Sequence, residues 1–212
     1  MIRALLLALV LSAPALAADR DAISGAVPPD GPSVPAGTMV QQRLLVKEGH
    51  WFFSAGFGWL ARGDYYDNPG FSIGLACWPK ETIGLEVRFT QFFSSMTGPA
   101  QTVFQETGIK PDAQMPQMRL LAGVRHSLTY GKLATSTASL HFDFQIAAHA
   151  GTLITDQSTT PAFDVAAAVL ARLSPHWFLQ LDATVMGTVE SRVRSSALSF
   201  GFLPELSIGV SM

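Results

Sequence analysis

The residues that could carry out hydrolysis stand next to each other at His126 and Ser127. A hydrolase needs a nucleophile and a base within hydrogen-bond reach. In an extended strand, however, neighbouring side chains point to opposite faces. No other nucleophile and base are placed to converge, so the sequence predicts no enzymatic activity and no catalytic residue.

Metal binding would draw on His141, Asp143 and His149. His141 and Asp143 share one face of an extended segment, but His149 lies eight residues beyond His141. Counted from His141, it lies about 27 Å along a strand, so one strand cannot bring all three side chains to one ion. Cys77 is the single cysteine, and we expect it to be a small apolar residue with no disulfide partner in the chain. The sequence predicts no metal site and no cofactor.

The elements that carry these residues alternate with a period of two, which is typical of β-strands. In HWFFSAGFGWL, residues 50–60, the large residues Trp51, Phe53, Phe57 and Trp59 alternate with Ser54 and two glycines. Eight segments share this pattern, and they cover residues 50–60, 69–78, 82–93, 116–127, 139–150, 161–173, 176–186 and 198–212.

The composition of the second face decides which side of these strands is the interior. Lysines at 47, 80, 110 and 132 fall outside the expected strands, whereas a soluble sandwich normally places several on its solvated faces. The second face instead carries Gly, Ala, Ser and charges of both signs, which suits a narrow lumen where charges pair. We therefore expect an all-β fold: an eight-stranded antiparallel transmembrane β-barrel with a charged, side-chain-filled interior. Its interior charge network is predicted to contain Glu86, Arg88, Arg119, Arg125, Asp143, Asp164, Arg172, Asp182 and Glu205.

Connection lengths predict the orientation in a membrane. Connections after the odd-numbered strands are longer than those after the even-numbered ones, as in bacterial outer-membrane barrels with short periplasmic turns and longer external loops. The sequence predicts a protein of the Gram-negative outer membrane whose outward face contacts lipid. Aromatic girdles at the two membrane interfaces are predicted at Trp51, Trp59, Tyr65, Tyr66, Trp78 and Trp177.

Composition divides the chain into three parts. Residues 1–17 have the basic start, apolar run and small-residue cleavage site of a signal peptide that is removed on export. Residues 18–49 form a Pro/Gly-rich segment expected in the periplasm, and residues 50–212 form the barrel. The 212 residues are 48% hydrophobic and only 14% charged, with a formal net charge of −2. This balance argues against nucleic acid as a partner.

The stretch QQRLLVKEGHWFFSAGFGWLARGDYYDNPGFSIGLACWPKETIGLEVRF, together with LPELSIGV near the end, resembles small outer-membrane β-barrel proteins of myxobacteria and related deltaproteobacteria. Several members of that family belong to the adventurous gliding motility machinery. The resemblance implies a non-enzymatic barrel that acts as a scaffold subunit of an envelope-spanning complex, with outer-membrane lipid and other envelope proteins as partners. Two alternatives remain: a narrow channel, and a barrel that binds an external ligand or surface through its long loops, above all residues 96–115.

Overall fold

The computed structural model describes residues 46–63, 65–111, 113–134, 139–191 and 196–212. The predicted signal peptide and residues 18–45 lie outside the described residues, so those two predictions stay untested. Only the last four residues of the expected periplasmic segment, 46–49, are described.

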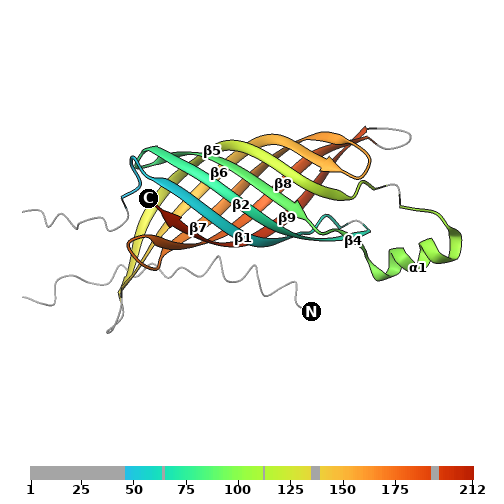
Figure 1. The fold of residues 1–212 in the computed structure, drawn as a ribbon, viewed down its shortest axis with the longest axis horizontal. Coiled ribbons are helices and arrows are strands. Elements are labelled where there is room, and N and C mark those ends of the chain that lie inside the picture. The colour runs from blue at the N-terminus through green and yellow to red at the C-terminus, as the bar shows by residue number, and fades with distance from the viewer. Residues whose placement is uncertain (1–45, 64, 112, 135–138, 192–195) are drawn as a thin grey trace, which may run out of the picture. The chain divides into compact units, whose positions relative to one another are not determined.

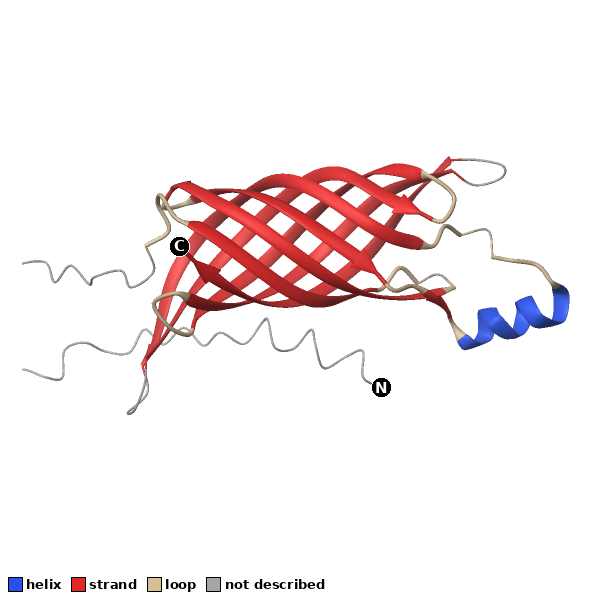
Figure 2. Ribbon diagram, viewed as in Figure 1, coloured by secondary structure: helices blue, strands red, loops and turns tan. Residues whose placement is uncertain are grey.

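Eight long antiparallel strands close into a barrel, which confirms the predicted fold class (Figures 1 and 2). Closure follows from the pairing of the first long strand with both the second and the last, so that no sheet edge is left over their paired length. A two-residue strand, β4, adds to β2 outside the barrel ring. The strands are β1 (Trp51–Leu60), β2 (Tyr66–Lys80), β3 (Ile83–Phe92), β4 (Ser95–Met96), β5 (Pro116–Ala134), β6 (Ser139–Thr155), β7 (Thr159–Arg172), β8 (Trp177–Ser191) and β9 (Ser196–Ser211).

The barrel has two distinct ends. At the end called here the termini end, β1 begins and β9 stops, and the backbones of Trp51 and Met212 are hydrogen-bonded to each other. The opposite end, called the loop end, carries the helix α1 (Gly98–Thr107) in the connection between β4 and β5 (Figure 1). α1 stops at Gly108, whose positive φ of 68° lets its N–H bond back to the carbonyl of Phe104. No helix among the described residues is long and apolar enough to cross a membrane.

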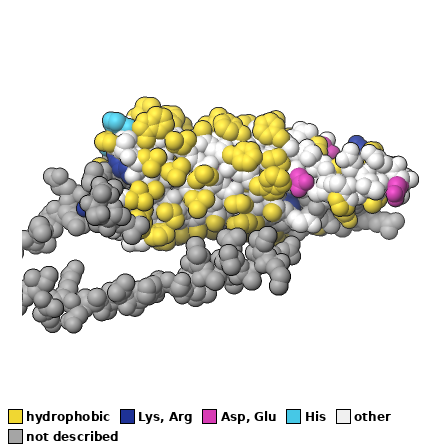
Figure 3. All heavy atoms as spheres, turned by 90° about the horizontal axis from the view of Figure 1, so that it is seen from below, with side chains coloured by type: hydrophobic (Ala, Val, Ile, Leu, Met, Phe, Trp, Pro, Cys, Tyr) yellow, Lys and Arg dark blue, Asp and Glu magenta, His cyan; other side chains and the backbone are white. Residues whose placement is uncertain are grey.

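The period of two sorts side chains as expected, with large apolar residues outward. Phe57 is 56% exposed and Leu181 54% exposed, although both lie in the middle of paired strands. Figure 3 shows hydrophobic side chains spread over the visible barrel wall, with charged atoms toward its two ends. Water would oppose so large an apolar exterior, whereas a lipid bilayer favours it.

Several strands are longer than the sequence analysis expected. The segment at 128–137, expected to be a periplasmic loop, is strand through Ala134, and Tyr130 pairs with Asp143. Residues 151–155, expected to lie in an external loop, belong to β6. The apolar pattern marks only the part of a strand that faces lipid. Backbone pairing continues beyond it, and in β5 a register shift between Ser127 and Thr129 interrupts the alternation.

Candidate functional site

The strongest concentration of chemistry lies in the middle of the barrel interior, where Glu86 of β3 joins two arginines. Its Oε1 accepts from Nη2 of Arg88 at 2.7 Å, and its Oε2 accepts from Nε of Arg125 at 2.6 Å. Arg125 also reaches β8, with Nη2 3.1 Å from Oδ1 of Asp182. Arg88 lies 3.4 Å from both Asp182 and Glu205. Each of these side chains is at most 4% exposed, so the ion pairs are screened little by water.

A second group continues from Glu86 toward β7 through His149. The two ring nitrogens of His149 lie 2.6 Å from Oδ1 of Asp164 and 3.2 Å from Oε2 of Glu86. Because carboxylates only accept hydrogen bonds, this geometry fits the imidazolium, in which both nitrogens donate. Asp164 also accepts from Nη1 of Arg119 at 3.1 Å, and Nη2 of Arg119 donates to the hydroxyl of Thr90. We call these two groups together, with Asp143, the charged layer.

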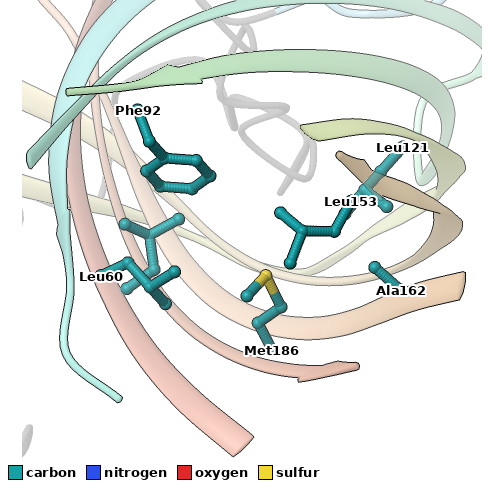
Figure 4. Close-up of a cluster of buried hydrophobic side chains, with 7 residues drawn as sticks. Leu60, Phe92, Leu121, Leu153, Ala162 and Met186 are labelled. Atoms are coloured by element: carbon teal, nitrogen blue, oxygen red, sulfur yellow. The ribbon is translucent and has the colours of Figure 1, made fainter. Parts of the chain in front are cut away.

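Apolar side chains close the interior on both sides of the charged layer. On β8, Asp182 lies between Phe178 toward the termini end and Met186 toward the loop end, and all three are buried. The termini-end apolar layer contains Phe52, Ala76, Trp78, Leu170 and Phe178. The loop-end apolar layer contains Leu60, Phe92, Leu121, Leu153, Ala162, Met186 and Leu203, most of which point into the barrel interior in Figure 4. Most of these charges therefore lie between two apolar layers, while Asp143 lies beside Leu170 of the termini-end apolar layer.

The segment just before β1 completes the termini end by inserting Lys47 into the barrel. Its Nζ lies 2.6 Å from Oδ2 of Asp143 and 4.5 Å from the centroid of the Trp78 ring, and the residue is 3% exposed. A carboxylate oxygen of Glu81, in the turn between β2 and β3, accepts from the backbone N–H of Lys47 and Glu48. Residues 46–50 therefore form a strap, called here the Lys47 strap, which is held against Trp78 and Glu81 while the Lys47 side chain reaches into the barrel.

Three of the predicted site residues lie elsewhere than expected. Arg172 is not part of the interior charge network: its guanidinium donates to the carbonyls of Ser174 and Pro175, because it stands where β7 ends and the turn offers unpaired acceptors. Tyr66 and Trp78 are buried at 7% and 2% exposure, so their assignment to the aromatic girdle is wrong. Both have the inward phase of β2, and a girdle residue needs the outward one.

The other predicted positions lie where the alternation puts them. Trp51, Trp59, Tyr65 and Trp177 are exposed, and their role as a membrane-interface girdle stays a prediction. The remaining eight predicted network residues are buried and make the ion pairs or hydrogen bonds of the charged layer. They are Glu86, Arg88, Arg119, Arg125, Asp143, Asp164, Asp182 and Glu205.

Two members of the site were missed from sequence. His149 has the same phase as Asp143 on β6, so the alternation alone places it inside. Lys47 carries no such signal, because it precedes the first strand in a segment whose composition predicts an extended linker. Among the described residues, the interior with Lys47 holds five buried carboxylates, three buried arginines and His149.

Neither a metal site nor a reactive pair emerges from this arrangement. The described residues contain no group of three His, Cys, Asp or Glu side chains that could hold a metal ion. His126, considered above beside Ser127, is exposed, whereas the Ser127 hydroxyl donates to Asp143 at 2.5 Å. Ser127 and His126 thus face different environments, and the buried carboxylates are paired with cationic side chains. The interior can hold the strands together and exclude water.

No known family model matches the sequence, and no curated protein matches it. Among solved structures, the chain is similar to Ail, the attachment invasion locus protein of Yersinia pestis, with 12% identity over 78% of this chain and 99% of that one, at a TM-score of 0.41. It is also similar to a de novo designed transmembrane β-barrel (14% identity, 78% and 95% covered, TM-score 0.40) and to Neisserial surface protein A (10% identity, 77% and 95% covered, TM-score 0.40). Nothing in these matches connects the chain with myxobacteria or gliding motility. The fold assignment depends on the strand pairing described above.

Proposed function

We propose that the protein is a non-enzymatic barrel of the Gram-negative outer membrane, sealed by its own side chains, which acts as a structural subunit of an envelope-spanning complex. The membrane location is supported by the closed strand ring and by the large apolar residues on its outer face. A closed barrel satisfies every backbone group along its paired strands internally, which a bilayer requires of a spanning β-structure.

The observation that carries the proposal is the enclosed charged layer. Arg119 and Asp182 are 0% exposed, although each would be fully hydrated in a water-filled pore. Eight strands give an interior that side chains can just fill. A narrow channel would need a continuous wet path past these ion pairs and through both apolar layers, so the structural role is favoured over the channel.

The termini end is where the barrel would hold its partner proteins. The Lys47 strap tethers the start of the barrel at its termini end through Glu81 and Asp143. With the N-terminal segment in the periplasm, as the connection lengths suggest, this tether would let the barrel hold periplasmic subunits. The resemblance noted from sequence makes the gliding motility machinery the first complex to examine.

Crosslinking in the native membrane tests this role. The barrel, tagged at residue 212, is crosslinked, solubilised in detergent and captured, and the proteins that come with it are identified and quantified by mass spectrometry. A matched variant lacking residues 18–41 serves as the control. A structural subunit predicts envelope proteins in fixed ratio to the barrel and their loss from the shortened variant. Recovery of the folded barrel alone from both would contradict the proposal.

A second candidate function is binding of an external ligand through the loop end. It is favoured by one specific observation, an apolar pocket beside α1 that lies apart from the sealed interior.

A further inference from the structure

The loop end contains a pocket of about 380 Å³ that no part of the sealed interior lines. One wall is α1, which contributes Pro99, Ala100 and Val103. The facing wall is the chain that returns after Gly108, and it contributes Ile109, Lys110 and Pro111. The volume lies within the range of small-molecule sites, which is about 300 to 1,000 Å³.

The pocket is built on the barrel, because its walls are tied to strand ends. The N–H of Thr97, which precedes α1, donates to the carbonyl of Tyr65 at 2.9 Å. Immediately before it, Met96 of β4 pairs with Tyr66 of β2. Beyond the return segment, the backbone of Met115 exchanges hydrogen bonds with Asp156 in the turn after β6. The loop therefore bridges two sides of the loop end, and the helix and return segment are anchored at both ends.

The described residues of the lining include an aromatic residue, two prolines and a cation. The Tyr65 ring also lines the pocket, so that it and the rings of Pro99 and Pro111 offer flat apolar faces. Val103 and Ile109 are 54% and 68% exposed in a loop that continues beyond the barrel strands, so both side chains are open to a ligand. Among the described residues, Lys110 is the charged side chain of the lining, and an anion beside it would complement the site.

We propose that this pocket binds a small aromatic carboxylate from outside the barrel. Its ring would lie among Tyr65, Pro99 and Val103, and its carboxylate would pair with the ammonium of Lys110. Flat rings pack well against proline and tyrosine, and the ammonium of Lys110 would favour a negatively charged ligand over a neutral one. The proposal does not depend on the structural role above, since binding at the loop end requires neither partner proteins nor a sealed interior.

The test uses the full barrel in lipid nanodiscs and the probe 2-naphthoate, with neutral 2-naphthalenemethanol as the matched ligand. Binding is measured by equilibrium dialysis, with empty nanodiscs subtracted. Wild type is expected to bind naphthoate saturably and more tightly than the alcohol. Lys110→Gln is expected to weaken naphthoate binding about threefold to fivefold, the effect of one exposed ion pair, and to leave alcohol binding unchanged.

Two further variants make the outcome decisive. Val103→Asp places a carboxylate in the pocket and is expected to abolish naphthoate binding, whereas Lys132→Gln, on the exposed end of β5, is expected to bind like wild type. Heat-modifiability on gels confirms that each variant is folded. Absence of saturable binding by wild type, equal affinity for both ligands, or equal losses in Lys110→Gln and Lys132→Gln would overturn the proposal.

Discussion

The ammonium of Lys47 lies 2.6 Å from Oδ2 of Asp143, 96 positions further along the chain. This ion pair joins the segment that precedes the barrel to the inner face of β6. Asp143 also accepts hydrogen bonds from Ser127 and Gln145, so the lysine supplies its one neutralising charge among the contacts seen. The strap and the charged layer are therefore one connected structure.

Removing that lysine should destabilise the barrel. Lys47→Ala leaves Asp143, which is 0% exposed, without its cation, and breaking a buried pair from one side costs about 3 kcal/mol. Urea unfolding in lipid vesicles, followed by tryptophan fluorescence, measures the change in the free energy of unfolding. Lys80→Ala, which removes an exposed lysine at the same end of the barrel, is the control and should change little. Equal unfolding midpoints for the two variants would show that the Lys47 pair contributes nothing.

Substitutions in the charged layer should have coupled effects on the free energy of unfolding. Arg125→Met removes one arginine from both Glu86 and Asp182, which keep Arg88. Arg119→Met removes an arginine from Asp164 alone, which keeps His149. We expect Arg125→Met to destabilise the barrel more. Adding Glu86→Gln to Arg125→Met should recover part of the loss, with an interaction free energy of about 1 to 3 kcal/mol in a double-mutant cycle. Strictly additive losses would mean that the two side chains do not act together in the folded barrel.

The loss of stability caused by a charge on the outer face should depend on the depth of that charge in the membrane. Leu181→Arg places a cation in the middle of the apolar wall and is expected to cost about 2 to 4 kcal/mol, while Val189→Arg, near the loop-end of β8, should cost about 0 to 1 kcal/mol. Urea unfolding in vesicles of the same lipid measures both. If both substitutions cost the same small amount, lipid does not surround this wall.

Much of the fold was predictable because a barrel wall has two chemically different faces. The period of two in β1, for example, assigns Phe57 outward and Gly58 inward with no further information. The same alternation would have placed Trp78 inward, and the error came from assigning girdle residues by type and position along the strand. The phase of the alternation is stronger evidence than residue type for whether a side chain points inward or outward.

The parts that sequence reasoning missed depend on contacts across the chain. Nothing local to Lys47 indicates that Glu81 holds its backbone or that Asp143 receives its charge. Arg172 has the inward phase, yet the carbonyls of the following turn hold its guanidinium. Likewise the hydrogen bond between Thr97 and Tyr65, which brings the start of α1 next to a residue of the pocket, is not revealed by a Pro- and Gly-containing loop sequence.

The central claim, a barrel sealed between two apolar layers, is tested most directly by single-channel recording. Purified, folded protein is inserted into planar lipid bilayers in concentrated potassium chloride, with a general porin as the positive control for insertion and protease protection as evidence that the barrel is inserted. The sealed barrel predicts a flat baseline with no stepwise currents at any applied voltage the bilayer tolerates. Reproducible, discrete conductance steps from the wild-type protein would contradict it and would establish a water-filled path through the charged layer.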